Sequence, residues 1–168
     1  MSEGNTSSSN GSPANEVVLI VDDEEMVLNS LNSFLMLETD YEVRTFTNPE
    51  EALEHVAQHP VDMVISDYLM PQMDGITFLG KVKAVQPDVP RIILTGYSDK
   101  ENAIKAINEV GLFQYVEKPW DNDRLHLIIR NGLEKQQLIK ELRTKIDAID
   151  KAHSDLQGIQ TEILKAFS

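Results

Sequence analysis

The sequence predicts an α/β fold in which five parallel strands form one sheet, helices cover both faces, and an extended helix ends the chain. Five predicted strands alternate with five predicted helices, and the connections between them are a few residues long. The first run, Val17–Val21, is apolar throughout, which is typical of a strand buried on both faces. Right-handed crossovers between parallel strands then require helices on both faces of the sheet.

Helix signals follow four of the strands in turn. Apolar side chains at helical spacing predict the first helix over Met26–Leu37. Asn48 before Pro49 predicts the cap and first turn of a second helix, which ends near Gln58. Asp99 is a predicted cap of the fourth helix and Asp121 of the fifth. The remaining predicted strands and helices are Tyr41–Phe46, Asp62–Ser66, Gly75–Val85, Arg91–Leu94, Lys100–Val110 and Gln114–Val116.

The chain divides into three parts. Residues 1–16 are rich in Ser, Asn and Gly with almost nothing to bury, which predicts a disordered tail. Residues 17–133 form the predicted globular domain, and 134–168 continue its last helix. Apolar positions in this last part step alternately by four and three, which favours a left-handed coiled coil and a dimer. One set is aliphatic and the other mixed: Leu142, Ile149, Leu156 and Ile163, then Ile146, His153, Gln160 and Phe167.

An alternative for this segment is a single amphipathic helix that folds back on the domain. In the coiled-coil interpretation, His153 and Gln160 are polar residues that set the register of the seam rather than ligands.

Charge and composition exclude several classes of protein. The net charge is −13, and because the segment from Asp121 to Ser168 is neutral, the first 120 residues carry all of it. Such an acidic domain repels nucleic acid and anionic membranes but suits a cation site. Cysteine is absent, which excludes disulfides and thiolate metal sites. Neither a secretory signal nor a membrane-spanning run is found, so we expect a cytoplasmic protein.

Acidic residues follow two of the predicted strands. Asp22 and Asp23 come directly after Val17–Val21, and Asp67 comes directly after Asp62–Ser66. Ligands of open parallel sheets bind beyond the carboxyl ends of the strands, so these carboxylates converge if the first and third strands are neighbours. Three negative charges in a partly dry crevice need a cation, and Mg²⁺ accepts carboxylates while it recruits phosphate oxygens. The sequence therefore predicts a magnesium site.

A hydroxyl and an amine reach the same edge of the sheet. Thr95 ends the segment RIILT of the fourth strand, and Lys118 ends the segment QYVEK of the fifth. Three acids, a hydroxyl and a lysine suit phosphoryl transfer, in which a carboxylate acts as nucleophile and the cations neutralise the transferred group.

The segments IVDDEE, SDYLMPQMDG, ILTGYSD and YVEKPW resemble the receiver domain of bacterial response regulators, from about Val17 to Leu133. This resemblance implies a flavodoxin-like, doubly wound sheet of strand order 2-1-3-4-5. It also implies that Asp67 is the phosphoacceptor. Asp22, Asp23, Asp67 and the backbone carbonyl of Leu69 would bind Mg²⁺, with Asp23 a more direct ligand than Asp22.

Further roles are implied by the same resemblance. Lys118 would pair with the phosphoryl oxygens, Thr95 would bind the phosphoryl group and move on activation, and Tyr115 would swing inward with it. The bond between Lys118 and Pro119 would be cis, while Pro71 and Gly75 would shape the loop after the acceptor. The phosphoryl donor would be a histidine kinase or a phosphotransfer protein, and the chain itself would not be a turnover enzyme.

Residues two positions after the acceptor Asp67 and after Thr95, the residue expected to move on activation, would set the phosphoryl lifetime. Leu69 lies two residues after Asp67, and Tyr97 two after Thr95. Neither is a carboxylate or amide that could orient an attacking water, so we expect a long-lived phosphoryl group.

The predicted output is a change in pairing between two subunits. It would act through the face formed by the fourth helix, fifth strand and fifth helix, and the coiled coil would carry the change to a partner or an output domain. The YVEKPW form with a helical extension resembles receivers joined to cyclic-dinucleotide phosphodiesterases, phosphatases or kinases. No basic helix-turn-helix segment supports direct DNA binding.

Two alternatives stay open at this point. A Mg²⁺-dependent phosphatase of the haloacid-dehalogenase type would also use an Asp nucleophile, but it would carry that nucleophile after the first strand. A degenerate receiver that serves only as a dimerisation or adaptor scaffold is the second alternative, and the complete set of acids, hydroxyl and lysine argues against it.

Overall fold

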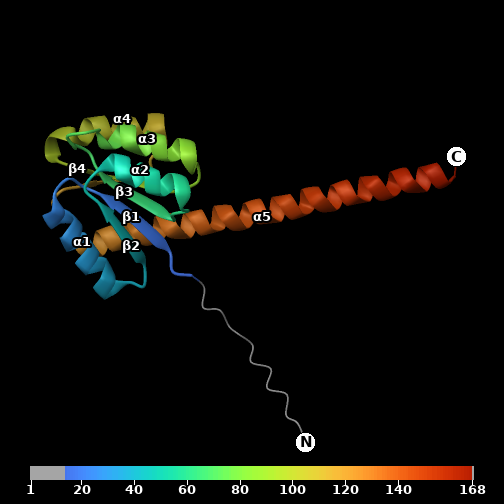
Figure 1. Ribbon diagram of the computed structural model, residues 1–168, viewed down its shortest axis with the longest axis horizontal. Helices are drawn as coiled ribbons and strands as arrows, with labels where there is room; N and C mark the ends of the chain where they lie inside the picture. The colour runs from blue at the N-terminus through green and yellow to red at the C-terminus, as the bar shows by residue number, and fades with distance from the viewer. Residues whose placement is uncertain (1–13, 168) are drawn as a thin grey trace, which may run out of the picture.

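The computed structural model describes residues 14–167 and shows strands and helices in strict alternation (Figure 1). The strands are β1 (Val17–Val21), β2 (Glu42–Phe46), β3 (Met63–Asp67), β4 (Arg91–Thr95) and β5 (Gln114–Glu117). The helices are α1 (Glu25–Glu38), α2 (Pro49–Gln58), α3 (Gly75–Val85), α4 (Lys100–Val110) and α5 (Asn122–Ala166), and a 3₁₀ turn (Tyr97–Asp99) precedes α4. Each predicted element exists, and the ends differ by one residue at most, except that α5 ends at Ala166 whereas the predicted helix runs to residue 168. The predicted tail lies almost wholly outside the described residues.

The sheet is parallel throughout and has the strand order β2-β1-β3-β4-β5. β1 lies between β2 and β3, so that Ile20 pairs with Thr45 on one side and with Ile65 on the other. The chain reverses its winding direction between β1 and β3, and the carboxyl ends of the strands at such a reversal are where open α/β sheets bind their ligands. The predicted flavodoxin-like fold is confirmed.

Helices cover both faces of the sheet (Figure 1). Alternate strand residues such as Leu19 and Val64 pack against α2, α3 and α4, while Ile20 and Ile65 pack against α1 and α5. This division follows from the period of two along a strand, which sends successive side chains to opposite faces. Because both faces are covered, the central strands β1, β3 and β4 are buried at nearly every position, whereas the edge strands β2 and β5 carry polar residues such as Arg44 and Gln114.

Helix caps agree with prediction at two of three predicted positions. The side chain of Asn48 accepts a hydrogen bond from the backbone N–H of Glu50, and Asp121 accepts from two N–H groups of α5. Asp99 precedes α4 as expected, but its side chain accepts no capping hydrogen bond. Its backbone is already helical, with φ −102° and ψ −1°, because it belongs to the 3₁₀ turn. A capping side chain needs extended backbone at its own residue, so the prediction of a side-chain cap at Asp99 was wrong.

A buried arginine ties β4 to the middle of α3 and to the end of α4. The Arg91 guanidinium donates to the carbonyls of Leu79, Val110 and Gly111 at 2.8–3.0 Å. Gly111 ends α4 in the left-handed conformation (φ 70°), which glycine adopts without steric cost. The cation therefore meets the negative end of the α4 dipole and satisfies carbonyls that the helix leaves unpaired.

Helix α5 belongs to the domain along its first half and leaves it along its second (Figure 1). Leu125, Ile129 and Leu133 pack in the core, and the buried Gln136 side chain donates to the carbonyl of Val61. Lys140 and Arg143 then form ion pairs with domain residues. From residue 141 to residue 167 every residue is exposed, so the helix does not fold back on the domain. The boundary at 133 and the coiled coil itself stay predictions.

No helix within residues 14–167 combines the length and the apolar composition that crossing a bilayer requires.

Candidate functional site

Three carboxylates meet where β1 and β3 end side by side. Asp22 follows β1, Asp23 is the next residue, and Asp67 is the last residue of β3. One carboxylate oxygen from each lies within 4.8 Å of the others. Asp22 is fully buried and Asp67 nearly so, whereas Asp23 is exposed. The predicted convergence of these acids is therefore present in the structure, with one ligand group open to solvent.

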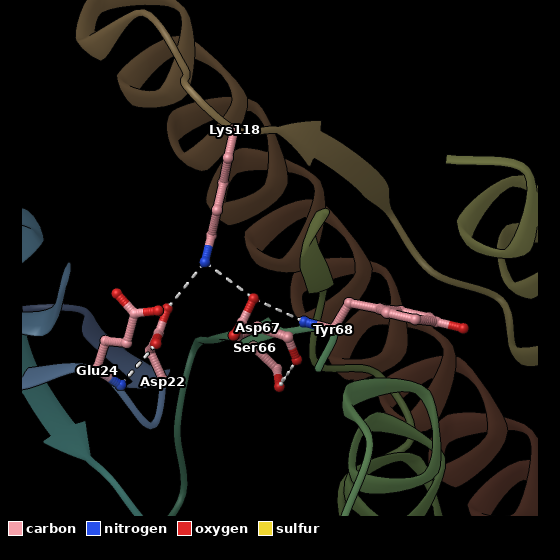
Figure 2. A network of polar contacts seen from close by, with 6 residues as sticks. All are labelled: Asp22, Glu24, Ser66, Asp67, Tyr68 and Lys118. Atoms are coloured by element: carbon pink, nitrogen blue, oxygen red, sulfur yellow. Dashed lines mark hydrogen bonds and ion pairs between the residues drawn. The ribbon is translucent and has the colours of Figure 1, made fainter. Parts of the chain in front are cut away.

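Lys118 reaches this acidic cluster from the end of β5. Its Nζ lies 3.0 Å from Oδ1 of Asp67 and 3.3 Å from Oδ2 of Asp22. Figure 2 shows its extended side chain pointing between the two carboxylates. The following bond to Pro119 is cis, as the resemblance implied. An ammonium between two acids is placed to neutralise negative charge that a ligand brings to the site.

Backbone N–H groups hold both buried carboxylates in place (Figure 2). Glu24 N donates to Oδ1 of Asp22 at 2.9 Å, and Tyr68 N donates to Oδ1 of Asp67 at 3.0 Å. These supporting groups were not predicted, although an Asp side chain often accepts from a backbone N–H one or two residues further on. Within residues 14–167, both hydrogen bonds of the Asp67 carboxylate go to Oδ1, which leaves Oδ2 as the oxygen available for chemistry.

The electrostatics of the site favour binding of a cation. Burial raises the pKa of the Asp22 and Asp67 carboxyls, and in each case the hydrogen bonds to the charged form only partly oppose it. Burial alone would lower the pKa of Lys118, but its hydrogen bond to Asp67 and the charges of both carboxylates outweigh burial and raise it. The ionised acids are therefore short of positive charge although Lys118 is present, which suits a divalent ion.

Thr95 supplies a hydroxyl without a partner. It ends β4, is fully buried, and its Oγ1 makes no hydrogen bond within the described part of the chain. A buried hydroxyl normally finds a partner, so an orphan one beside a cation site suits a ligand oxygen that completes its bonding. Tyr115 lies one strand further on, half-buried against the α3–α4 side of the core. Its predicted inward rotation stays a prediction.

The loop after Asp67 is fixed by a close approach of two backbone segments. Gly75 N donates to the carbonyl of Tyr68 at 2.7 Å. A Cβ at Gly75 would overlap the carbonyl oxygen of Asp67, so only glycine allows α3 to start here. Asp74 caps α3 by accepting from Thr77 N, which assigns this acid a structural role rather than a place in the cation site.

The other predicted site residues are less constrained by the structure. The Leu69 side chain is 61% exposed, and the role of its carbonyl as a metal ligand stays a prediction. The side chain of Tyr97 lies outside what the structure describes. Pro71 is exposed on the loop that leads to Gly75.

The fold and the acidic site define a doubly wound α/β domain of the receiver class. The family model of the response regulator receiver domain matches residues 18–130, and this chain belongs to that family. Membership goes against the haloacid-dehalogenase alternative, whose nucleophile would follow β1.

Relatives and solved structures agree with this membership. The hydrogenase transcriptional regulatory protein HoxA of Cupriavidus necator is 36% identical over 121 residues, which cover 72% of this chain and 25% of HoxA. The regulatory protein AtoC of Escherichia coli is 37% identical over 75% of this chain and 27% of its own length. The signal receiver domain of an HD domain-containing protein from Pseudomonas fluorescens superposes with a TM-score of 0.71 and 37% identity, covering 76% of this chain and 93% of that chain. The chain thus spans about a quarter of the length of these two curated relatives.

Proposed function

We propose that Asp67 accepts a phosphoryl group from a phosphohistidine on a histidine kinase or phosphotransfer protein. The observation that carries this proposal is the position of Asp67, which lies between an ammonium at 3.0 Å and two further carboxylates. Its Oδ2 would form the new bond to phosphorus while the bond from phosphorus to the donor imidazole breaks. The donor nitrogen keeps the electron pair of that bond, so no oxidant or further reactant is needed.

Mg²⁺ fits the donor set of this site, which offers hard carboxylate oxygens and no sulfur. Asp22, Asp23, Asp67 and the Leu69 carbonyl would hold the ion. When bound, it would neutralise charge on the phosphoryl oxygens.

Residues of the chain itself would bind the phosphoryl oxygens and carry the conformational change. Lys118 would donate to a phosphoryl oxygen, and the orphan hydroxyl of Thr95 would turn to donate to another. Since Lys118 N already donates to the carbonyl of Thr95, movement at β4 is coupled to the end of β5. Tyr115 would then rotate inward, and the face formed by α4, β5 and α5 would change shape.

The proposed output is a change in assembly between two copies of the chain, made through this face and the exposed half of α5. Helix α5 begins four residues after Lys118, so it is placed to carry the change to a partner or an output domain. The protein would act as a phosphoacceptor with slow self-dephosphorylation rather than as a turnover enzyme, and it would work in the cytoplasm. Its acidic surface argues against nucleic acid as a direct partner.

Intact mass after treatment with acetyl phosphate and Mg²⁺ tests the proposal. Wild type should gain about 80 Da, the mass of one phosphoryl group on a carboxylate nucleophile. Asp67→Asn should gain nothing, while Asp74→Asn, altered in a nearby exposed acid, should react like wild type. An equal adduct on Asp67→Asn, or no adduct on wild type from acetyl phosphate or from a phosphohistidine protein, would contradict the proposal. The second of these results would favour the degenerate scaffold.

A further inference from the structure

The exposed half of α5 carries an apolar stripe that no part of its own domain covers. Leu142, Ile149, Leu156 and Ile163 recur every seven residues and are 50–66% exposed. Ile146, His153 and Gln160 form a second row beside them, three residues before the next aliphatic position. We call these two rows the seam.

The rest of the helix suggests that the seam needs a partner. Most helix stability in proteins comes from packing of an amphipathic face. The described contacts of α5 with its domain include the ion pairs at Lys140 and Arg143, beyond which every described residue of the helix is exposed. A second helix along the seam would supply the missing packing.

We propose that the seam pairs with the seam of a second copy of this chain, parallel and in register. This inference rests on the proposed assembly through α5 and fixes its orientation. Both acidic sites would then lie at the same end of the dimer.

The polar residues of the seam favour the parallel arrangement. In a parallel dimer each residue of the second row faces its own counterpart, so His153 meets His153 and Gln160 meets Gln160. In an antiparallel dimer the two rows face one another, which sets these polar side chains against aliphatic ones. An amide without a partner in an apolar layer is costly, whereas two facing amides can hydrogen-bond to each other.

The residues that flank the seam fit the same register. In parallel dimers the position just before the second row meets, in the other chain, the position five residues further on. Lys145 thereby meets Asp150, an opposite charge, and Ile159 meets Leu164, a second apolar residue. Ile159 and Leu164 are 52% and 72% exposed in the single chain, so this register buries two further apolar side chains. Residues five apart do not face each other on one helix, so these matches have meaning only between chains.

The glycine of the exposed half of α5 lies on the side of the helix that faces away from the seam. Gly158 lies opposite the seam, together with Lys151 and Lys165, and a Cβ added at Gly158 would meet nothing within 4 Å. A glycine in a helix is least damaging where no packing depends on its side chain. Its position on the outer side is therefore compatible with pairing along the seam.

Single-cysteine variants of the full chain, which has no cysteine of its own, test the orientation. Under oxidised glutathione, Ile163→Cys in the seam should form a disulfide-linked dimer, whereas Lys151→Cys on the outer side should not. Each variant is oxidised before and after treatment with acetyl phosphate and Mg²⁺. Non-reducing gels and sedimentation velocity give the readout.

Two other cross-linking results would contradict the proposal, and each would contradict a different part of it. Cross-linking only in a mixture of Ile146→Cys with Ile163→Cys would show an antiparallel pair, which retains the assembly through α5 but not its orientation. A monomer without cross-links under both conditions would remove the assembly as well, while the mass experiment on Asp67 would stand independently.

Charge reversal tests the register. Lys145→Glu should weaken the dimer by roughly tenfold, because it replaces two attractions between chains by repulsions. Combining it with Asp150→Lys should restore the dissociation constant to near that of wild type. A double variant as weak as the single one would contradict the in-register pairing.

Discussion

Lys118 Nζ lies 3.0 Å from Asp67 Oδ1 although the two residues are 51 positions apart and their strands are not neighbours. β4 lies between β3 and β5, so the lysine side chain reaches across the end of a whole strand. Thr95 is the residue that ends this intervening strand, and its carbonyl accepts from Lys118 N at 2.8 Å. The amine, the hydroxyl and the acceptor acid are thus positioned by three consecutive strands of one sheet.

Replacement of the bridging lysine should separate phosphorylation from metal binding. Lys118→Met removes the ammonium that would donate to the phosphoryl group, and loss of one such donor slows a transfer by roughly 100-fold. Mg²⁺ affinity should be kept or increased, because the acids lose a competing cation. Phosphorylation rates with acetyl phosphate and Mg²⁺ titrations provide the measurement, with the exposed Lys100→Met as control. Loss of Mg²⁺ binding in Lys118→Met would contradict this division of roles.

Without Mg²⁺, the acidic cluster should weaken the fold as pH rises. The pKa of Asp67 is raised by burial, so the folded protein binds this proton more tightly than the unfolded chain. The resulting stabilisation is complete below an ordinary Asp pKa of about 4 and is lost as pH rises through the raised value. Asp67→Asn should therefore match wild type near pH 4 and melt roughly 3 °C higher at neutral pH.

Thermal melts in EDTA across this pH range, repeated with Mg²⁺, would measure this effect. Mg²⁺ should raise the Tm of wild type and close the gap to Asp67→Asn. The exposed Asp40→Asn serves as a control with the same change in charge. A gap that does not vary with pH would speak against burial as its cause.

The glycine beneath the acceptor should tolerate no side chain. Gly75→Ala places a Cβ onto the carbonyl oxygen of Asp67, and overpacking of this kind costs about 2 kcal/mol. Gly80→Ala is a matched control in the same helix, since its Cβ would only touch Val110 at 3.8 Å. That control should be neutral or stabilising by up to about 1 kcal/mol. Urea unfolding compares the two variants, and equal effects would show that the close approach is not limiting.

The buried arginine should matter for stability rather than for phosphorylation. Arg91→Met removes the donor to the Leu79 carbonyl within α3 and to the Val110 and Gly111 carbonyls at the end of α4, which should cost about 3 kcal/mol in the free energy of unfolding. The exposed Arg44, paired with Glu42, provides the control: Arg44→Met should cost less than about 1 kcal/mol. Denaturant titration is the measurement. A stable Arg91→Met protein would mean that water replaces the guanidinium.

The lifetime of the phosphoryl group should depend on Leu69. Wild type offers no carboxylate or amide at this position, so we expect phosphate to be retained for minutes or longer. Leu69→Asn adds an amide that can orient water and should shorten the lifetime by about tenfold. Leu69→Ala is the control because it removes bulk without adding an amide. Loss of phosphate from wild type within seconds would contradict the expectation.

Sequence patterns predicted the alternation of elements, the layers and the converging acids, because these depend on local periodicity and on where strands end. They did not predict the hydrogen bonds that hold α5 to the base of the domain. In the sequence, nothing distinguishes Lys140 and Arg143 from other basic residues of a solvent-exposed helix. Their partners Asp62 and Asp88 lie in loops far away in the sequence. Only the three-dimensional path of the helix brings these charges together. The missing cap at Asp99 has a similar origin, since the 3₁₀ turn that contains it left no separate sequence signal.

The ion pairs of Lys140 and Arg143 lie at the edge of the domain opposite Asp67, where α5 leaves the domain and would pivot in a movement of the whole helix. At 1.5 Å per residue, roughly 27 Å of helix lie between Asn122 and Lys140, and roughly 39 Å between Lys140 and Ala166. A tilt imposed at the start of α5, beside Lys118, would therefore displace the far tip by about half as much again, in the opposite direction. Small movements at the acidic site would be enlarged and inverted by the time they reach the C-terminal end.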